Sequence, residues 1–186
     1  GDGLKVAKVL ENGPCNIAGS KIAAGVVVTA VDGAPLPPTT DPASLLNRKA
    51  GQRVLLSLAS ADGKAKWDEV VKPMTLGDEG ELLYRRWIRQ RAALTEKLSG
   101  GKVGYVHVRD MDDEGFRHAY KDIVGKNSDK LALLVDTRFN GGGWLHDDLC
   151  KLLNGERVMD FAPRGKHVGS EPLFRWSRPV AVLQSE

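Results

Sequence analysis

The first part of the chain carries the hydrophobic period of β-strands. Apolar and polar side chains alternate along residues 4–10, and residues 26–31 form a run rich in β-branched side chains. Patterns of this kind predict strands with one or both faces buried. Two further runs, residues 54–58 and 66–71, are separated by an Asp-Gly turn and predict a hairpin. We therefore expect a compact, mostly β domain over residues 1–75.

Helical signals appear in two places. Asp41 followed by Pro42 is typical of an N-cap with proline in the first helical turn, and predicts a short helix over residues 41–47. Further along, apolar residues recur at helical spacing within residues 79–98. This stripe consists of Leu83, Trp87, Leu94 and Leu98. We expect residues 76–101 to form a helix that links two domains.

The second half alternates between strand and helix patterns. Three runs predict buried strands: residues 103–108, 131–135 and 179–183. The second run is almost wholly apolar, as a parallel strand buried on both faces requires. Asp112 predicts the cap of a helix, and the glycines at 141–143 lead into another helix. The β-α-β-α order predicts a mainly parallel sheet, in an α/β domain over residues 102–186.

Charge and composition narrow the range of functions. The formal net charge of +3 is too small to indicate a nucleic-acid partner, and charges of both signs are mixed along the chain. The arginine-rich residues 85–91 are interpreted as the solvent face of the linking helix, so we expect no nucleic acid. No run approaches the ~18 apolar residues of a membrane span. Cys15 and Cys150 are expected to be buried thiols rather than a disulfide.

Several short motifs in the first domain resemble a peptide-binding module. These motifs are Gly3-Leu4-Lys5-Val6, Gly13-Pro14, Ala18-Gly19-Ser20-Lys21-Ile22 and Val31-Asp32-Gly33. Together they resemble bacterial PDZ domains, in the strand-permuted form attached to processing proteases. The resemblance implies that Gly3, Leu4, Lys5 and Val6 bind a peptide, which would add as a strand beside residues 4–10. The alternative is a PDZ fold that serves only as a spacer.

Two motifs of the second half resemble the catalytic domain of tricorn and the related C-terminal processing peptidases. They are residues 99–108, which read SGGKVGYVHV, and residues 136–143, which read DTRFNGGG. The resemblance implies a partial crotonase/ClpP-like α/β domain after the PDZ-like domain, so the fold class is α+β. It also implies that the parent protein is a serine endopeptidase.

The same resemblance implies that essential catalytic groups lie outside this chain. In the family, the histidine precedes the PDZ domain, the serine nucleophile follows the strand that matches residues 180–183, and a glutamate comes later. We therefore expect a fragment that lacks its nucleophile and histidine and is inactive alone. The alternative is a non-catalytic peptide-binding or scaffolding module. The parent is expected to act on peptides or proteins, to be homo-oligomeric, and to lie in a bacterial periplasm or cytoplasm.

The glycines before the last helix are the candidate catalytic feature. A helix N-terminus offers unpaired backbone N–H groups and partial positive charge, and glycine lets a substrate approach closely. Such donors stabilise the oxyanion of acyl transfer. The resemblance places a donor in this loop, and Gly141 and Gly142 are the predicted donors. The alternative is a glycine-rich turn that binds no ligand.

Other chemistries fit this loop poorly. No Gly-Lys-Ser/Thr follows the glycines, and the dinucleotide spacing is absent, so a phosphate-binding loop is not expected. Crotonase-type thioester chemistry would use the same fold without a preceding PDZ domain. His146 and Cys150 lie one helical turn apart but lack the spacing of a zinc site, so we expect no metal and no cofactor. Asp136 and Arg138, at a strand end, are expected to fix the geometry of the loop.

Overall fold

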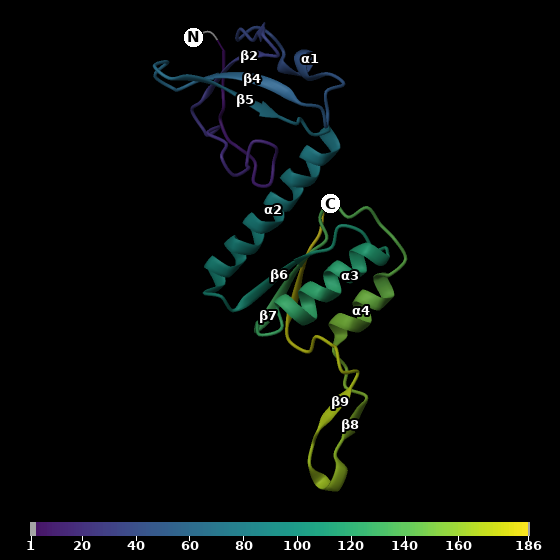
Figure 1. Ribbon diagram of the computed structural model, residues 1–186. Coiled ribbons are helices and arrows are strands. Elements are labelled where there is room, and N and C mark those ends of the chain that lie inside the picture. Colours follow the sequence, from purple (N-terminus) through teal and green to yellow (C-terminus); the bar gives the residue numbers. More distant parts are fainter. Residues whose placement is uncertain (1–2, 186) are drawn as a thin grey trace. The chain divides into compact units, whose positions relative to one another are not determined.

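A computed structural model describes residues 3–185 (Figure 1). The chain forms two compact units, Gly1–Trp87 and Ile88–Glu186, and each has its own hydrophobic core. The predicted helix within residues 79–98 is present as α2 (Leu76–Ser99), which runs from the first unit into the second.

The first unit is an antiparallel sheet with one short helix. Its strands are β1 (Leu4–Lys5), β2 (Val27–Val31), β3 (Ala34–Pro35), β4 (Val54–Ala59) and β5 (Lys66–Val71). Their order is β1-β2-β4-β5, with β3 also paired to β2. Helix α1 (Pro42–Leu46) begins as predicted, because the Asp41 carboxylate accepts a hydrogen bond from the Ala43 N–H at 3.0 Å.

The core of the first unit forms because β4 alternates. Val54, Leu56 and Leu58 point inward and are buried, while Leu55 between them is exposed. The opposing β2 contributes Val31 to the same cluster. Each such side chain stabilises the fold by roughly 1.5–3 kcal/mol through removal of apolar surface from water.

The strand predicted over residues 4–10 is much shorter in the structure. Only Leu4 and Lys5 pair with β2, and this prediction was wrong for the rest of the run. The Val6 N–H still donates to the Val26 carbonyl at 2.7 Å. The segment opposite then turns away, because the Val26 N–H donates to the carbonyl of Ala23. A strand cannot continue without a neighbouring strand to pair with.

The second unit is a three-stranded parallel sheet with helices, as the alternating pattern predicted. The strands are β6 (Val103–His107), β7 (Ala132–Asp136) and β10 (Val180–Leu183), ordered β10-β7-β6. The helices are α3 (Asp113–Lys121), which continues as a π-helical turn (Asp122–Lys126), and α4 (His146–Asn154). Asp112 caps α3, and Gly155 ends α4 in the left-handed conformation with φ 64°.

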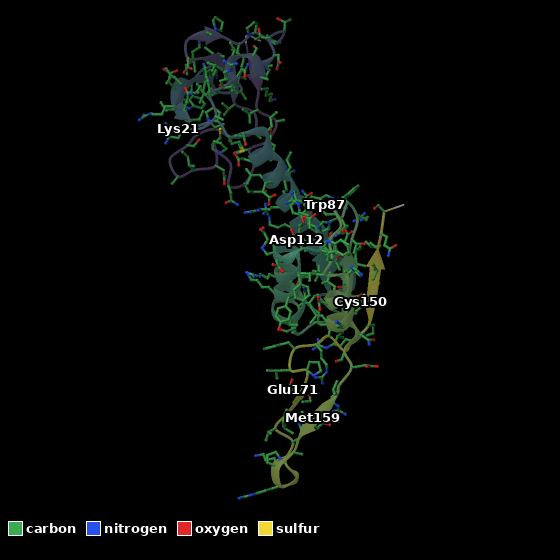
Figure 2. The ribbon with its side chains drawn as sticks, turned by 90° about the vertical axis from the view of Figure 1, so that its right-hand side faces the viewer. Lys21, Trp87, Asp112, Cys150, Met159 and Glu171 are labelled. Atoms are coloured by element: carbon green, nitrogen blue, oxygen red, sulfur yellow. The ribbon has the colours of Figure 1, made fainter. Side chains whose placement is uncertain are left out.

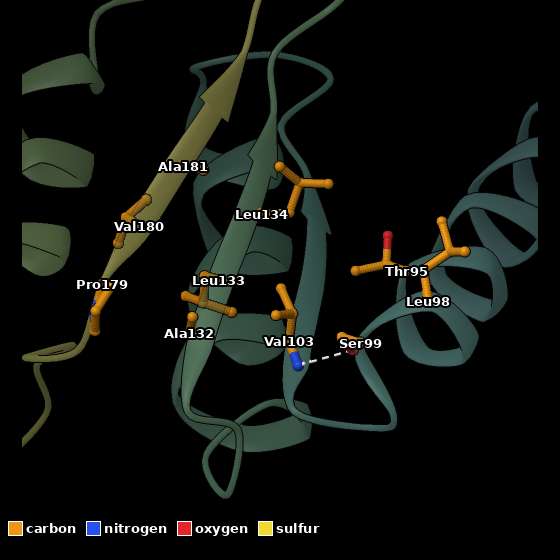
Figure 3. Close-up of a pocket in the computed structure, with 10 residues that line it drawn as sticks. All are labelled: Thr95, Leu98, Ser99, Val103, Ala132, Leu133, Leu134, Pro179, Val180 and Ala181. Carbon is orange, nitrogen blue, oxygen red and sulfur yellow. Dashed lines mark hydrogen bonds between the residues drawn. The ribbon is translucent and has the colours of Figure 1, made fainter.

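The helices cover one face of this sheet. Val106, Leu133 and Val135 of the strands pack with Ile123 and Leu149 into one buried cluster. The other face is hollowed by an apolar groove of about 430 Å³, drawn in Figure 3. The groove is lined by Thr95, Leu98, Ser99, Val103, Ala132, Leu133, Leu134, Pro179, Val180 and Ala181. The end of α2 therefore borders the sheet, although Leu98 of its apolar stripe is 78% exposed.

A short hairpin extends from the second unit and was not predicted. It consists of β8 (Met159–Phe161) and β9 (Gly169–Glu171), joined through a 3-10 turn (Pro163–Gly165). Met159 pairs with Glu171 in the register of this hairpin, and both are labelled in Figure 2. Within the described residues, the two strands pair only with each other and lie outside the two larger sheets. They therefore bury no continuous hydrophobic face, and no long apolar run in the sequence marks them.

Both cysteines are free thiols, as expected. The prediction that they are buried is wrong for Cys150, which lies on an exposed position of α4 (Figure 2). Cys15 is partly buried, and this burial raises the pKa of its thiol, with a further contribution from the charge of Glu69.

Candidate functional site

The candidate site lies at the carboxyl edge of the parallel sheet. Parallel strands end at the same edge, and in open α/β sheets ligands bind beyond this edge. Here the register places His107 of β6 and Leu183 of β10 on either side of Asp136, the last residue of β7. The segments that follow β6 and β7 therefore meet beside the end of β10.

A buried carboxylate anchors this edge. Asp136 has no exposed surface, and its Oδ2 accepts a hydrogen bond from the Tyr105 hydroxyl at 2.7 Å. The Arg138 side chain reaches back to the same carboxylate, from Nε to Oδ1 at 2.9 Å and from Nη2 to Oδ2 at 2.6 Å. The Arg138 backbone N–H adds a fourth bond at 3.1 Å. Since every donor is supplied by the protein, the buried charge is satisfied.

The protonation states follow from these contacts. Burial by itself would raise the pKa of Asp136, but the hydrogen bonds from Arg138 and Tyr105 outweigh it and hold the pKa at about 2. Burial, together with the bond to Asp136, raises the pKa of the Tyr105 phenol well above its usual value. At neutral pH Asp136 is therefore an ion that Tyr105 and Arg138 hold in place.

The glycine loop after β7 is fastened to the segment after β6. The Asn140 side chain donates through Nδ2 to the Val108 carbonyl at 2.8 Å, and the Gly141 N–H donates to the Arg109 carbonyl at 2.9 Å. The Met111 N–H in turn donates to the Gly142 carbonyl at 2.7 Å. These bonds hold the loop in one conformation along several residues.

This close attachment explains Gly143 and leaves little free space at Gly141. A Cβ on Gly143 would lie 2.3 Å from the Met111 carbonyl oxygen, and its φ of 135° is a conformation that side chains disfavour. A Cβ on Gly141 would lie 2.2 Å from Oδ1 of Asp110. At Gly143 the two backbones can approach this closely only without a side chain, whereas the neighbour of Gly141 is the end of the Asp110 side chain.

The predicted oxyanion donors are both engaged within the protein. The Gly141 N–H bonds Arg109, and the Gly142 N–H donates to the Asn140 side-chain oxygen at 2.7 Å. Within residues 3–185, the Gly143 N–H makes no hydrogen bond. Helix α4 begins only at His146, so the glycines precede the helix by a short turn. A donor role for Gly141 or Gly142 stays a prediction.

The predicted peptide-binding residues lie on the edge strand of the first unit. Leu4 and Lys5 form β1, which pairs with β2 on one side and with no described strand on the other. Gly3 packs so closely on β2 that a Cβ would lie 2.5 Å from the Val28 carbonyl oxygen. A groove of about 800 Å³ begins at Val6 and is lined by Val6, Lys8, Val9 and Leu10 and by α1. Of the four predicted residues, the structure places only Val6 in this groove.

Two residues of the site were missed by the sequence analysis. Both residues lie in the motifs that carry the resemblance, but the sequence patterns predict no role in the site for either one. Tyr105 could have been suspected because a polar hydroxyl in a buried strand needs a partner. The contact of Thr137 with Leu183 joins residues 46 positions apart, which no local pattern signals.

The described part of the chain shows neither a metal cluster nor a spanning helix. Among residues 3–185, no three His, Cys, Asp or Glu side chains are grouped so that they could hold a metal ion. No helix in the same range is both long and apolar enough to cross a membrane.

Comparison with known proteins accounts for both units. Residues 5–75 match the family model of the tricorn protease PDZ domain, and residues 102–186 match peptidase family S41. The chain belongs to the tricorn-type peptidases of family S41. As a tricorn-type chain, it pairs the two matched domains in the order that its motifs predicted.

Its tricorn-type relatives are longer proteins. Tricorn protease homolog 1 of Streptomyces coelicolor is 32% identical over 93% of this chain and 16% of its own length. The tricorn protease homolog of Saccharolobus solfataricus is 33% identical over 70% of this chain and 12% of its own length. A crystal structure of the tricorn protease matches the whole chain with a TM-score of 0.74 at 24% identity, over 18% of that chain. This likeness confirms the predicted α+β fold.

Proposed function

We propose that this chain is the part of a serine endopeptidase that supplies backbone oxyanion donors and a peptide-docking PDZ domain. The observation that carries the proposal is the glycine loop, which hydrogen bonds fasten at the carboxyl edge of the S41 segment, beside the end of β10. The serine nucleophile and the histidine would come from residues beyond this chain. We therefore expect the chain alone to hydrolyse no peptide.

The proposed reaction assigns the loop one task. The serine Oγ would attack the scissile carbonyl carbon while the histidine takes its proton, and the carbonyl oxygen becomes an oxyanion. Collapse breaks the C–N bond, the proton passes to the leaving amine, and water then hydrolyses the acyl-enzyme. Because the Gly143 N–H is unbonded within residues 3–185, we add it to Gly141 and Gly142 as a candidate donor. Loss of one such donor costs about 2.7–4 kcal/mol of transition-state stabilisation.

The PDZ unit would hold the peptide substrate. The outer edge of β1 offers backbone groups to an added strand, and the groove that starts at Val6 offers an apolar lining. Among its described lining residues, Lys8 and Arg48 outnumber one carboxylate, Glu79, and this excess of positive charge would favour a peptide with a negative end. A homo-oligomeric state of the full-length protein, measurable by light scattering, is part of the same proposal.

Active-site labelling tests the proposal. The full-length protein and the present chain would each be treated with a serine-directed fluorophosphonate, and the adducts would be located by mass spectrometry. We expect one stoichiometric adduct on the full-length protein, at a serine that follows residue 186, and no adduct on the chain alone. An adduct on Ser170, Ser177 or Ser185 of the chain would contradict the assignment of the nucleophile.

The second candidate function is a peptide-binding or scaffolding module without catalysis. It is favoured by the groove in the first unit, which requires no catalytic group. The same labelling experiment distinguishes the two functions. A full-length scaffold would bind peptides but would neither react with the fluorophosphonate nor hydrolyse peptides.

A further inference from the structure

Thr137 joins the end of β10 to the start of the glycine loop. Its backbone N–H and its Oγ1 both donate to the Leu183 carbonyl, at 2.8 Å and 3.0 Å. Its own carbonyl accepts from the Asn140 N–H at 3.1 Å, at the start of the loop. A single residue therefore contacts both segments that meet at the candidate site.

The residues on either side of Thr137 restrict the movement of its backbone. Asp136 before it is the fully buried carboxylate, and Arg138 after it is bonded to that carboxylate through side chain and backbone. The Arg138 carbonyl also lies 3.0 Å from Nε2 of His107 on β6. Movement of Thr137 would disturb the ion pair between the buried Asp136 and the partly exposed Arg138, so Thr137 holds the Leu183 carbonyl in a defined position.

The hydroxyl bond exceeds what the sheet needs. The backbone N–H of Thr137 already continues the parallel ladder between β7 and β10. The second donor on the same Leu183 oxygen fixes the orientation of the peptide group that leads out of β10. Any residue except proline could supply the first bond, but the second requires a side-chain hydroxyl, as in serine or threonine.

We propose that Thr137 is a positioning residue, which sets the chain after Leu183 against the backbone donors of the glycine loop. The inference rests on the proposed function, in which the nucleophile follows β10 and the oxyanion donors lie at 141–143. Thr137 touches no substrate in this arrangement. It acts through Leu183 and Asn140, and small displacements of reacting groups lower rates by up to about a hundredfold.

The test compares Thr137→Val and Thr137→Ser in the full-length protein. Valine keeps the shape and the backbone bond but lacks the hydroxyl, whereas serine restores the donor. We expect Thr137→Val to lower kcat and the fluorophosphonate labelling rate by about tenfold or more, with KM changed less than about twofold. Thr137→Ser should retain most of the activity. Equal kcat in wild type and Thr137→Val would overturn the inference and leave the proposed function intact.

The matched control is Thr29→Val. Thr29 also donates through Oγ1 to a strand carbonyl, that of Ser57 at 3.0 Å, but it lies in the PDZ unit. Both valine variants should shift the melting temperature similarly, and only Thr137→Val should affect kcat. A similar loss of kcat in Thr29→Val would show a general effect of stability and would contradict a positioning role.

Hydrogen exchange on the present chain gives a readout that needs no activity. We expect Thr137→Val to speed amide exchange by about fivefold in peptides that cover residues 137–143, with little change near Ile123. If the full-length wild type neither labels nor hydrolyses peptides, the proposed function fails. The exchange result then decides by itself whether the Thr137 hydroxyl holds the glycine loop against the end of β10. Unchanged exchange in residues 137–143 would overturn the inference.

Discussion

At the scale of single residues, the site depends on how one buried charge is satisfied. Asp136 ends a strand that is apolar up to that point, and its carboxylate would be costly to bury alone. Tyr105 lies on the neighbouring strand, and Arg138 returns from the following turn, so both reach the same carboxylate. The charge therefore acts as a structural anchor for the turn that begins the glycine loop.

The lowered pKa of Asp136 predicts an acid-dependent stability. Its folded pKa of about 2 lies below the ordinary value of 3.8, so its contribution is fully present above about pH 4. That contribution is lost as the pH falls from about 4 towards 2. We expect Asp136→Asn to destabilise the second unit by roughly 3 kcal/mol at pH 6, because Arg138 loses its partner. The gap from wild type should narrow below pH 4.

Thermal unfolding between pH 2 and pH 6 would measure this gap. The control is Asp129→Asn, because Asp129 is exposed in the same unit. A gap between wild type and Asp136→Asn that stays constant over the whole pH range would show that the carboxylate charge contributes nothing to stability.

At the scale of elements, helix caps decide how the sheet of the second unit is covered. Helix α3 starts where the Asp112 carboxylate accepts the Gly115 N–H at 2.8 Å, a position labelled in Figure 2. From this start, Ala119 and the following Ile123 fall on the buried face of the helix. The cap thus fixes which side chains enter the core.

Removal of this cap should weaken the second unit measurably. We expect Asp112→Ala to lower its unfolding free energy by about 1 kcal/mol, and Asp112→Ser to recover most of the loss. Urea titration would measure both, with Asp113→Ala as the control because Asp113 is exposed and forms no cap. Equal losses for Asp112→Ala and Asp113→Ala would mean that helix charge, not the cap, is responsible.

At the scale of the whole molecule, the two hydrophobic cores are separate. Leu58 is 1% exposed in the core of the first unit, and Leu133 is 1% exposed in that of the second. The two clusters share no residue. Each unit is therefore expected to unfold as its own cooperative block.

Core truncation in each unit tests this independence. We expect Leu58→Ala and Leu133→Ala each to cost about 2–5 kcal/mol, confined to the unit that carries the change. Hydrogen exchange with mass spectrometry would report residues 54–71 and 103–136 separately. Faster exchange in both ranges after either substitution would show that the units unfold together.

The sequence by itself predicted most of the helices and strands, apart from the β8–β9 hairpin, and it pointed to the family of the chain. Periodicity predicted β4, β5, α2 and the parallel strands of the second unit, because burial repeats every two residues in strands and every 3.6 in helices. The helix caps at Asp41 and Asp112 could also be predicted, because each cap bonds to a backbone N–H only two or three residues away. The motif at residues 136–143 pointed to the tricorn-type peptidases before any geometry was known.

Only the tertiary structure decided what depends on distant partners. The strand predicted over residues 4–10 stops after Lys5, because its ladder partner turns away at Val26. Gly141 and Gly142 donate within the protein, because the segment after β6 lies against them. Thr137 acquires its contact with Leu183 only when β10 pairs with β7. Local patterns encode local hydrogen bonds, whereas bonds between distant segments exist only after the sheet has formed.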